Sequence, residues 1–143
     1  MQRSEISGII GGKNVLRRDI ASRMDLIQLS SKGITKDSLL HLARYLSMSI
    51  RQMAELLPVT ERTIQRYKRK QRFNRVVSEQ ALQIAEVAAR GGEVFGDRDK
   101  FLSWMRSASP ALGNHTPASL LRSRFGMEVV LDELGRIEHG VVS

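Results

Sequence analysis

Residues Ser49–Arg75 read SIRQMAELLPVTERTIQRYKRKQRFNR and predict two short helices, joined by a tight turn and followed by a basic run. The apolar residues that recur there at three- and four-residue spacing, and so give each helix one face to bury, are Ile50, Met53, Leu57, Ile64 and Tyr67. Pro58 lacks an amide hydrogen and disfavours a helical backbone at the residue before it, so the first helix should end there. Thr60 then occupies an N-cap position, and the second helix is predicted from Glu61 to about Arg69.

The outward face of the second predicted helix carries side chains that suit DNA recognition. Arg can donate two hydrogen bonds to guanine and Gln can pair with adenine, so Gln65 and Arg66 are expected to read bases. From Arg62 to Arg75 the chain holds seven Lys or Arg in fourteen residues and no acid, which suits phosphate contacts. The candidate DNA-binding residues are Thr60, Glu61, Arg62, Gln65, Arg66, Lys68, Arg69, Lys70 and Arg72. The alternative interpretation is a helical hairpin whose charged face is merely solvated.

The same stretch resembles the helix-turn-helix of the Xre-type repressors. The matching residues are Ala54 in the first helix, Val59 in the turn, and Thr60 and Ile64 at the start of the second helix. Pro58 stands where the motif usually has Gly, so the turn differs from the common form. The resemblance implies that the second helix enters the DNA major groove.

Composition and charge divide the chain into two different halves. Residues 1–75 carry 16 Lys or Arg and 6 Asp or Glu, whereas residues 76–143 carry 7 and 9, so a basic half precedes a slightly acidic one. The absence of cysteine excludes disulfides and thiolate metal sites. No apolar run reaches the length of a membrane span, and the N-terminus has no signal-peptide core, so a cytoplasmic protein is expected.

Outside the hairpin the sequence predicts only helices, and therefore an all-α fold. Residues Met1–Gly12 are expected to form a loose arm, and Asn14–Ser31 a helix with an imperfect apolar stripe that includes Met24 and Ile27. Thr35 is expected to cap a further helix behind the helix-turn-helix.

A long helix with a broad apolar face is predicted over Val77–Arg90. Ser78 followed by Glu79 is expected to cap its start, and Gly91 and Gly92 are expected to end it.

The last third of the chain predicts three short helices separated by loops. The first helix follows Asp97 and carries Phe101, Trp104 and Met105. The second opens at Thr116-Pro117, ends at Gly126 and is expected to place Leu120, Leu121 and Phe125 in the core. The third spans Glu128–Ile137.

This region is similar to the C-terminal toxin-binding domain of the Xre/MbcA/ParS antitoxins. The resemblance rests on VFGDRDKFLSWM, SPALGNHTPASLL and LGRIEHGVVS, within about residues 93–143, and Asn114 replaces a second Gly after Gly113. The resemblance implies an antitoxin that binds a RES-domain toxin, an NAD-consuming or ADP-ribosyltransferase-like protein. It also implies that the antitoxin covers the toxin's active site and represses its own operon as a dimer.

We expect the chain end, residues 136–143, to enter or cover the NAD pocket of such a toxin. A chain end can be threaded into a concave site without a return strand, and Val141 and Val142 add apolar area. Gly135 and Gly140 would permit sharp turns at the two ends of this segment. The candidate toxin-binding residues are Trp104, Asn114, His115, Arg136, Ile137, Glu138, His139, Gly140, Val141, Val142 and Ser143.

The expected organisation is an arm over residues 1–24, a helix-turn-helix region over 25–90 and a toxin-binding domain over 91–143. A homodimer is expected because one recognition helix contacts too few base pairs for useful specificity.

Enzymatic activity is not expected, because the three histidines are scattered and no acid pair, phosphate loop or nucleophile motif accompanies them; no metal or cofactor is expected either. The alternatives are an orphan Xre-type transcriptional regulator without a toxin, and an adaptor that binds protein or RNA through its basic helix.

Overall fold

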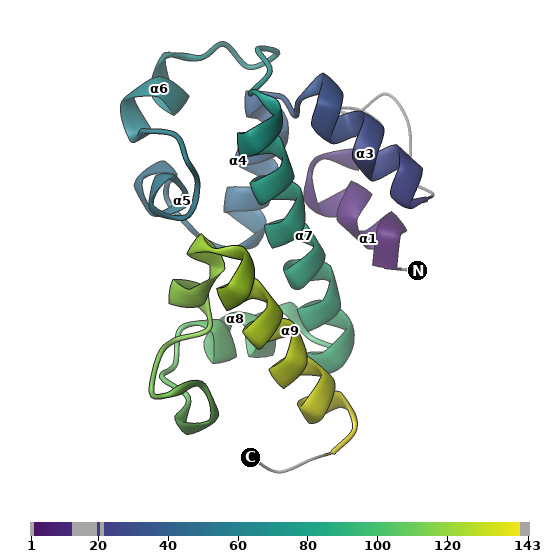
Figure 1. Cartoon of the computed structure of the whole chain (residues 1–143), viewed down its shortest axis with the longest axis vertical. Helices are drawn as coiled ribbons and strands as arrows, with labels where there is room; N and C mark the ends of the chain where they lie inside the picture. The colour runs from purple at the N-terminus through teal and green to yellow at the C-terminus, as the bar shows by residue number, and fades with distance from the viewer. Residues whose placement is uncertain (1, 13–19, 21, 141–143) are drawn as a thin grey trace. The chain divides into compact units, whose positions relative to one another are not determined.

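The computed structural model describes residues 2–12, 20 and 22–140, and all regular secondary structure in that part of the chain is helical (Figure 1). Two isolated β-bridges, Thr35 with Arg72 and Ser109 with His115, are the extended pairings that accompany the helices there. None of the helices in the described ranges combines the length and the apolar character needed to cross a membrane. The predicted all-α fold is confirmed.

The chain divides into two compact units, Met1–Glu86 and Val87–Ser143. Helix α7 (Arg75–Phe95) begins in the first unit and ends in the second. The other helices of the first unit are α1 (Gln2–Ile9), α3 (Arg23–Lys32), α4 (Lys36–Tyr45), α5 (Ile50–Leu56) and α6 (Glu61–Arg66). Helix α4 contacts both α1 and α5, so it is the central helix of this unit. The core of the first unit includes Ile6, Ile10, Leu39, Leu42, Met53, Ile64 and Ile84.

The N-terminal residues form a helix, so the expected loose arm is wrong. Ile6 and Ile9 lie on α1, Ile10 directly follows it, and all three are buried. Because α1 contacts α4, these three side chains have a partner surface that a sequence pattern cannot reveal.

Helix α3 is shorter than the predicted Asn14–Ser31 helix, of which residues 14–19 and 21 lie outside the described ranges. The Ser22 side chain accepts a hydrogen bond from the Asp25 amide, and the Asp25 carboxylate accepts one from the Ser22 amide, so α3 starts at Arg23. Met24 and Ile27, expected in the apolar stripe, are 59% and 56% exposed.

Helix α7 starts earlier than predicted because Asn74, not Ser78, caps it. The Asn74 carboxamide oxygen accepts a hydrogen bond from the Val77 amide at 2.9 Å. Ser78 is buried inside the helix, where its hydroxyl accepts from the Ile34 amide at 3.0 Å and so fastens α7 to the segment before α4.

Helix α7 also continues through Gly91 and Gly92 to Phe95, so the expected end at the two glycines is wrong. A side chain at Gly91 would collide with the ring of Phe101, which is fully buried. Gly91 therefore allows close packing against an aromatic ring and does not terminate the helix.

The second unit contains the end of α7, helix α8 (Arg98–Met105), the 3-10 helices η1 (Pro110–Leu112) and η2 (Ala118–Arg122), and helix α9 (Arg124–Glu138). Helix α9 contacts both 3-10 helices. The rings of Phe95, Phe101 and Trp104 form one cluster, with centroids 5.5 Å apart for Phe95 and Trp104. The core includes Phe101, Leu102, Met105, Leu112, Leu121, Met127, Val130 and Leu134.

Three expectations for the end of the chain are corrected. Thr116-Pro117 opens a 3-10 helix that stops at Arg122, and α9 begins at Arg124, where the Ser123 hydroxyl accepts from the Gly126 amide. Gly126 lies inside α9 because its missing side chain leaves room for the Leu120 carbonyl group. Phe125 consequently belongs to α9 and is 79% exposed, not buried.

Candidate functional site

Helices α5 and α6 form the predicted helix-turn-helix. Leu57 has an extended backbone (φ −123°, ψ 151°) and ends α5, in agreement with the effect expected of Pro58. The Thr60 hydroxyl accepts a hydrogen bond from the Thr63 amide at 3.1 Å and starts α6 at Glu61. Helix α6 ends at Arg66 and not near Arg69, because the chain becomes extended at Tyr67.

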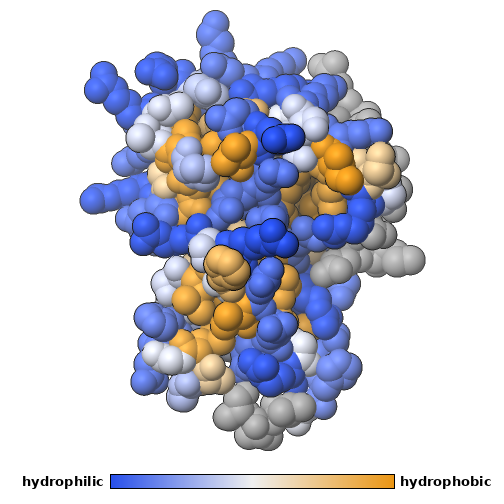
Figure 2. All heavy atoms as spheres, viewed as in Figure 1, coloured by the Kyte–Doolittle hydropathy of each residue, from blue (hydrophilic) through white to orange (hydrophobic). Residues whose placement is uncertain are grey.

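The predicted DNA-binding side chains lie on the outer surface of α6 and of the segment after it. Ile64 is fully buried, and this orients α6 so that the side chains of Arg62, Gln65 and Arg66 face solvent. Figure 2 shows hydrophilic side chains projecting around α6. Thr60, Lys68, Arg69, Lys70 and Arg72 are also exposed, whereas Glu61 is half-buried.

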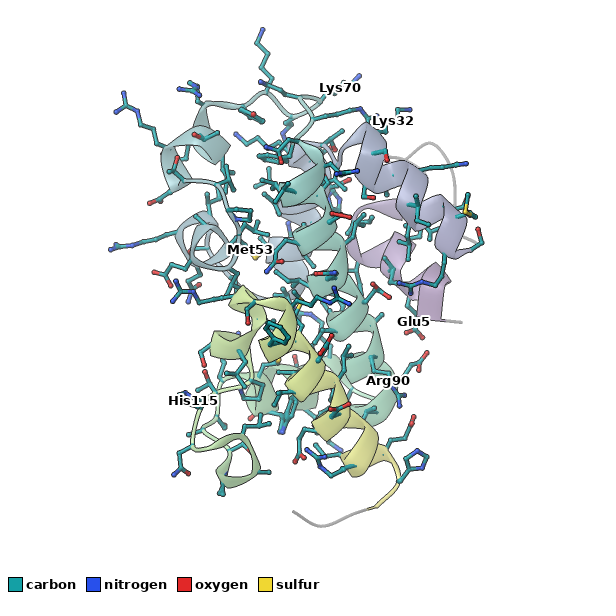
Figure 3. The ribbon with its side chains drawn as sticks, in the orientation of Figure 1. Glu5, Lys32, Met53, Lys70, Arg90 and His115 are labelled. Carbon is teal, nitrogen blue, oxygen red and sulfur yellow. The ribbon has the colours of Figure 1, made fainter. Side chains whose placement is uncertain are left out.

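Hydrogen bonds separate these candidates into two groups. Arg69 pairs with Asp37 at 3.0 Å, Arg72 donates to the Gly33 carbonyl, and Gln65 donates to Glu61 at 3.3 Å. The other group, which has no side-chain ion pair within the described ranges, consists of Arg62, Arg66, Lys68 and Lys70. Lys70 is labelled in Figure 3. The side chains of the second group are therefore better placed to contact base edges and phosphates. The sequence alone did not distinguish the two groups.

Arg66→Ala should weaken binding to a specific DNA site by about 1–3 kcal/mol and relax the preference at one base pair, because Arg66 is exposed on the outer face of α6. Lys70→Ala should weaken specific and random DNA alike and flatten the salt dependence. Titrations of labelled duplexes at several salt concentrations measure both effects. Equal weakening of both DNAs by Arg66→Ala would contradict its assignment as a base-reading residue.

The candidate toxin-binding residues before α9 lie in two settings. Trp104 is half-buried in the aromatic cluster, so part of its ring serves the core of the second unit. Asn114 and His115 are exposed on the loop between η1 and η2, and His115 is labelled in Figure 3. The backbone hydrogen bonds that hold this loop include one from the Ser109 amide to the His115 carbonyl at 3.1 Å and one from the Asn114 amide to the Ser109 carbonyl at 2.8 Å. Asn114 has a left-handed backbone (φ 65°), which Asn tolerates.

The C-terminal segment expected to contact the toxin, residues 136–143, is helical in its first part. Arg136, Ile137 and Glu138 all belong to α9, and Gly135 lies within the helix without making a turn. His139 follows the helix and Gly140 has φ 73°, whereas Val141, Val142 and Ser143 lie outside the described ranges. The segment expected to contact the NAD pocket therefore begins as helix at Arg136, and its contact with a toxin stays a prediction.

Ion pairs fix both charged residues at this end of α9. Arg136 bonds the buried Glu133 at 2.8 Å. Arg90 holds Glu138 through two bonds of 2.7 and 2.5 Å (Arg90 is labelled in Figure 3). This hydrogen-bonded pair lowers the pKa of Glu138 and raises the pKa of Arg90. Arg90 therefore fastens the end of α9 to α7.

An apolar surface on α9 was missed by the sequence analysis. Phe125 is 79% exposed and Val129, one helical turn later, is 43% exposed. The spacing of the two residues gave a signal, but placing Phe125 on a helix that ended at Gly126 put it in the core. We call Phe125 and Val129 the α9 apolar surface.

Comparison with known proteins defines the class of this protein. Residues 25–86 match the family model described as the antitoxin Xre-like helix-turn-helix domain. Residues 90–140 match the antitoxin Xre/MbcA/ParS C-terminal toxin-binding domain. This order of domains is that of the antitoxin Xre family, a regulatory and non-enzymatic kind of protein. The chain belongs to the Xre/MbcA/ParS antitoxin family.

Two curated relatives are similar to about half of the chain. "Antitoxin Xre" of Yersinia enterocolitica serotype O:8 / biotype 1B is 37% identical over 73 residues, which cover 50% of this chain and 49% of that protein. "Antitoxin Xre" of Photorhabdus laumondii subsp. laumondii is 36% identical over 75 residues, which cover 52% and 51%. The chain thus spans about half the length of the curated relatives it matches.

Proposed function

We propose that this protein is an antitoxin that binds and inhibits a RES-domain toxin through its second unit and represses its own operon through its first. The observation that carries the proposal is the presence, in one chain, of a capped helix-turn-helix and a match to a toxin-binding domain. The family relationship supports a toxin partner, and the RES class follows from the resemblance described above.

The first unit supplies the chemistry needed for operator binding. Helix α6 presents Arg62, Gln65 and Arg66 on its outer face, where guanidinium and carboxamide groups can pair with base edges. Lys68 and Lys70 follow immediately and can bind phosphates. Repression follows if the bound operator overlaps the promoter of the operon.

The second unit supplies an apolar surface of the kind that anchors protein complexes. An aromatic side chain as exposed as that of Phe125 buries little area within the fold, but it can bury a large area against a partner. We propose that the α9 apolar surface contacts the toxin and that His139–Ser143, the segment after α9, approaches its NAD pocket. Arg90 and Glu138 then determine where that segment leaves the helix.

Homodimer formation is part of the proposal. Met24 and Ile27 lie one turn apart on α3 and Val76 lies near the start of α7, and all three are more than half exposed in the first unit. Burial of these side chains against a second copy would place two recognition helices on one duplex, as inverted half-sites require.

The proposal predicts that a neighbouring reading frame encodes a RES-domain protein, and the test is coexpression of this chain with that protein. We expect the antitoxin to copurify with that protein, to restore growth of cells that express it, and to shift DNA from the operon's upstream region but not random DNA. Specific DNA binding without capture of the RES-domain protein would overturn the toxin-binding part and favour an orphan regulator. Capture without specific DNA binding would overturn the repressor part.

A further inference from the structure

The end of helix α6 depends on a residue from another helix. Helix α6 is only six residues long, so its last carbonyl groups need donors from beyond the helix. The Tyr67 amide donates to the carbonyl groups of Thr63 and Ile64. The Lys36 ammonium group donates to the Gln65 carbonyl at 3.1 Å and to the Tyr67 carbonyl at 2.9 Å. A cation is favourable there because the C-terminal end of a helix carries partial negative charge.

The position of Lys36 in its own helix makes this contact informative. Thr35 caps α4, so Lys36 is the first residue of that helix, where the partial positive charge of the helix end disfavours a cation. Its own helix thus gives no reason for a lysine. The carbonyl groups of Gln65 and Tyr67, which accept hydrogen bonds from the Lys36 ammonium group, provide such a reason.

The segment after α6 is attached to the same place by its backbone. The Lys36 amide donates to the Gln71 carbonyl at 3.0 Å, the Asp37 amide to the Arg69 carbonyl at 2.9 Å, and the Phe73 amide to the Ile34 carbonyl at 2.9 Å. Tyr67 stacks on Phe73 with ring centroids 4.8 Å apart. These contacts hold the basic segment independently of the Lys36 side chain, so removing that side chain should loosen mainly the last turn of α6.

We propose that Lys36 is a positioning residue for DNA reading, which holds the C-terminal end of α6 through its ammonium group and does not bind DNA phosphate. The two acceptors flank Arg66, so the contact fixes the backbone from which this candidate base-reading side chain projects. Specific recognition depends on that direction, whereas phosphate attraction depends mainly on charge. The inference rests on the proposed DNA-binding function.

Lys36→Met and Lys70→Met in the full chain form a matched pair, because both remove one ammonium group and keep a long side chain. Affinity is measured for the operon's upstream DNA and for a random duplex between about 50 and 200 mM salt. Lys36→Met should lower operator affinity about five- to tenfold, leaving random-duplex affinity and the salt slope within error of wild type. Lys70→Met should weaken both DNAs and reduce the slope by about 0.9.

Hydrogen exchange of the free protein tests the same contact without DNA. The amides of Arg66 and Tyr67 should exchange about tenfold faster in Lys36→Met, while the core amides of α7 are unchanged. A Lys36→Met salt slope reduced as much as that of Lys70→Met would overturn the proposal and make Lys36 a phosphate contact. Unchanged exchange at α6 would also overturn it. Absence of operator preference in the wild type would instead refute the proposed function, while exchange would still test the Lys36 contact.

Discussion

Phe125→Ala should raise the dissociation constant for the proposed RES-domain toxin about thirtyfold or more, which corresponds to a loss of at least about 2 kcal/mol at an interface hot spot. Phe125 is 79% exposed, so removal of its ring takes little packing from the free protein, and most of the effect should appear in the complex. Val129→Ala should have the same direction and a smaller size, because its side chain is smaller and 43% exposed. Both are measured by calorimetry with purified toxin.

Leu131→Ala is the matched control, because Leu131 is also an exposed apolar residue of α9 but projects from a different side of the helix. We expect it to bind the toxin like the wild type. Unchanged affinity of Phe125→Ala, together with loss of binding when the chain is cut after Glu138, would move the contact from the α9 apolar surface to the segment after α9. The thermal midpoint of each variant checks that folding is intact.

Gly126→Ala and Gly135→Ala should change the stability of the second unit in opposite directions, although both replace a glycine within α9. A Cβ at Gly126 would collide with the carbonyl group of Leu120, a backbone atom that cannot rotate away, so we expect a loss of about 1–3 kcal/mol. A Cβ at Gly135 meets nothing within 4 Å, so the better helix propensity of Ala should stabilise the unit by about 0.8–1 kcal/mol.

Trp104 makes this comparison simple to measure. It is the only tryptophan of the chain and lies in the second unit, so its fluorescence during urea unfolding reports that unit. Equal stabilisation by the two substitutions would show that the gain in helix propensity outweighs the close approach of the Leu120 carbonyl group to residue 126. Stabilisation by Gly126→Ala would contradict the described packing of η2 against α9.

Local signals in the sequence were sufficient for the helix-turn-helix. Pro58 ends α5 and Thr60 caps α6, because both effects act within a few residues of the position that causes them. The same holds for Thr35 at the start of α4 and Asp97 at the start of α8. The all-α class followed from the periodicity of the apolar residues.

Glycine was the main source of wrong boundaries. Gly91 and Gly126 were interpreted as helix ends, whereas each lies within a helix and leaves room for a group from elsewhere in the chain. A glycine that permits close packing and a glycine that ends a helix look identical in a single sequence. Only the positions of Phe101 and Leu120 distinguish the two roles.

The sequence by itself determined the helical class, the hairpin with its basic run, and the family resemblance of the C-terminal region. These depend on residue type and short-range spacing. The tertiary structure alone decided which charged side chains have partners, namely Arg69 with Asp37 and Glu138 with Arg90. It also decided that Lys36 supports α6 and that Phe125 faces solvent. Each of these depends on how the elements pack against one another in three dimensions, which no local pattern encodes.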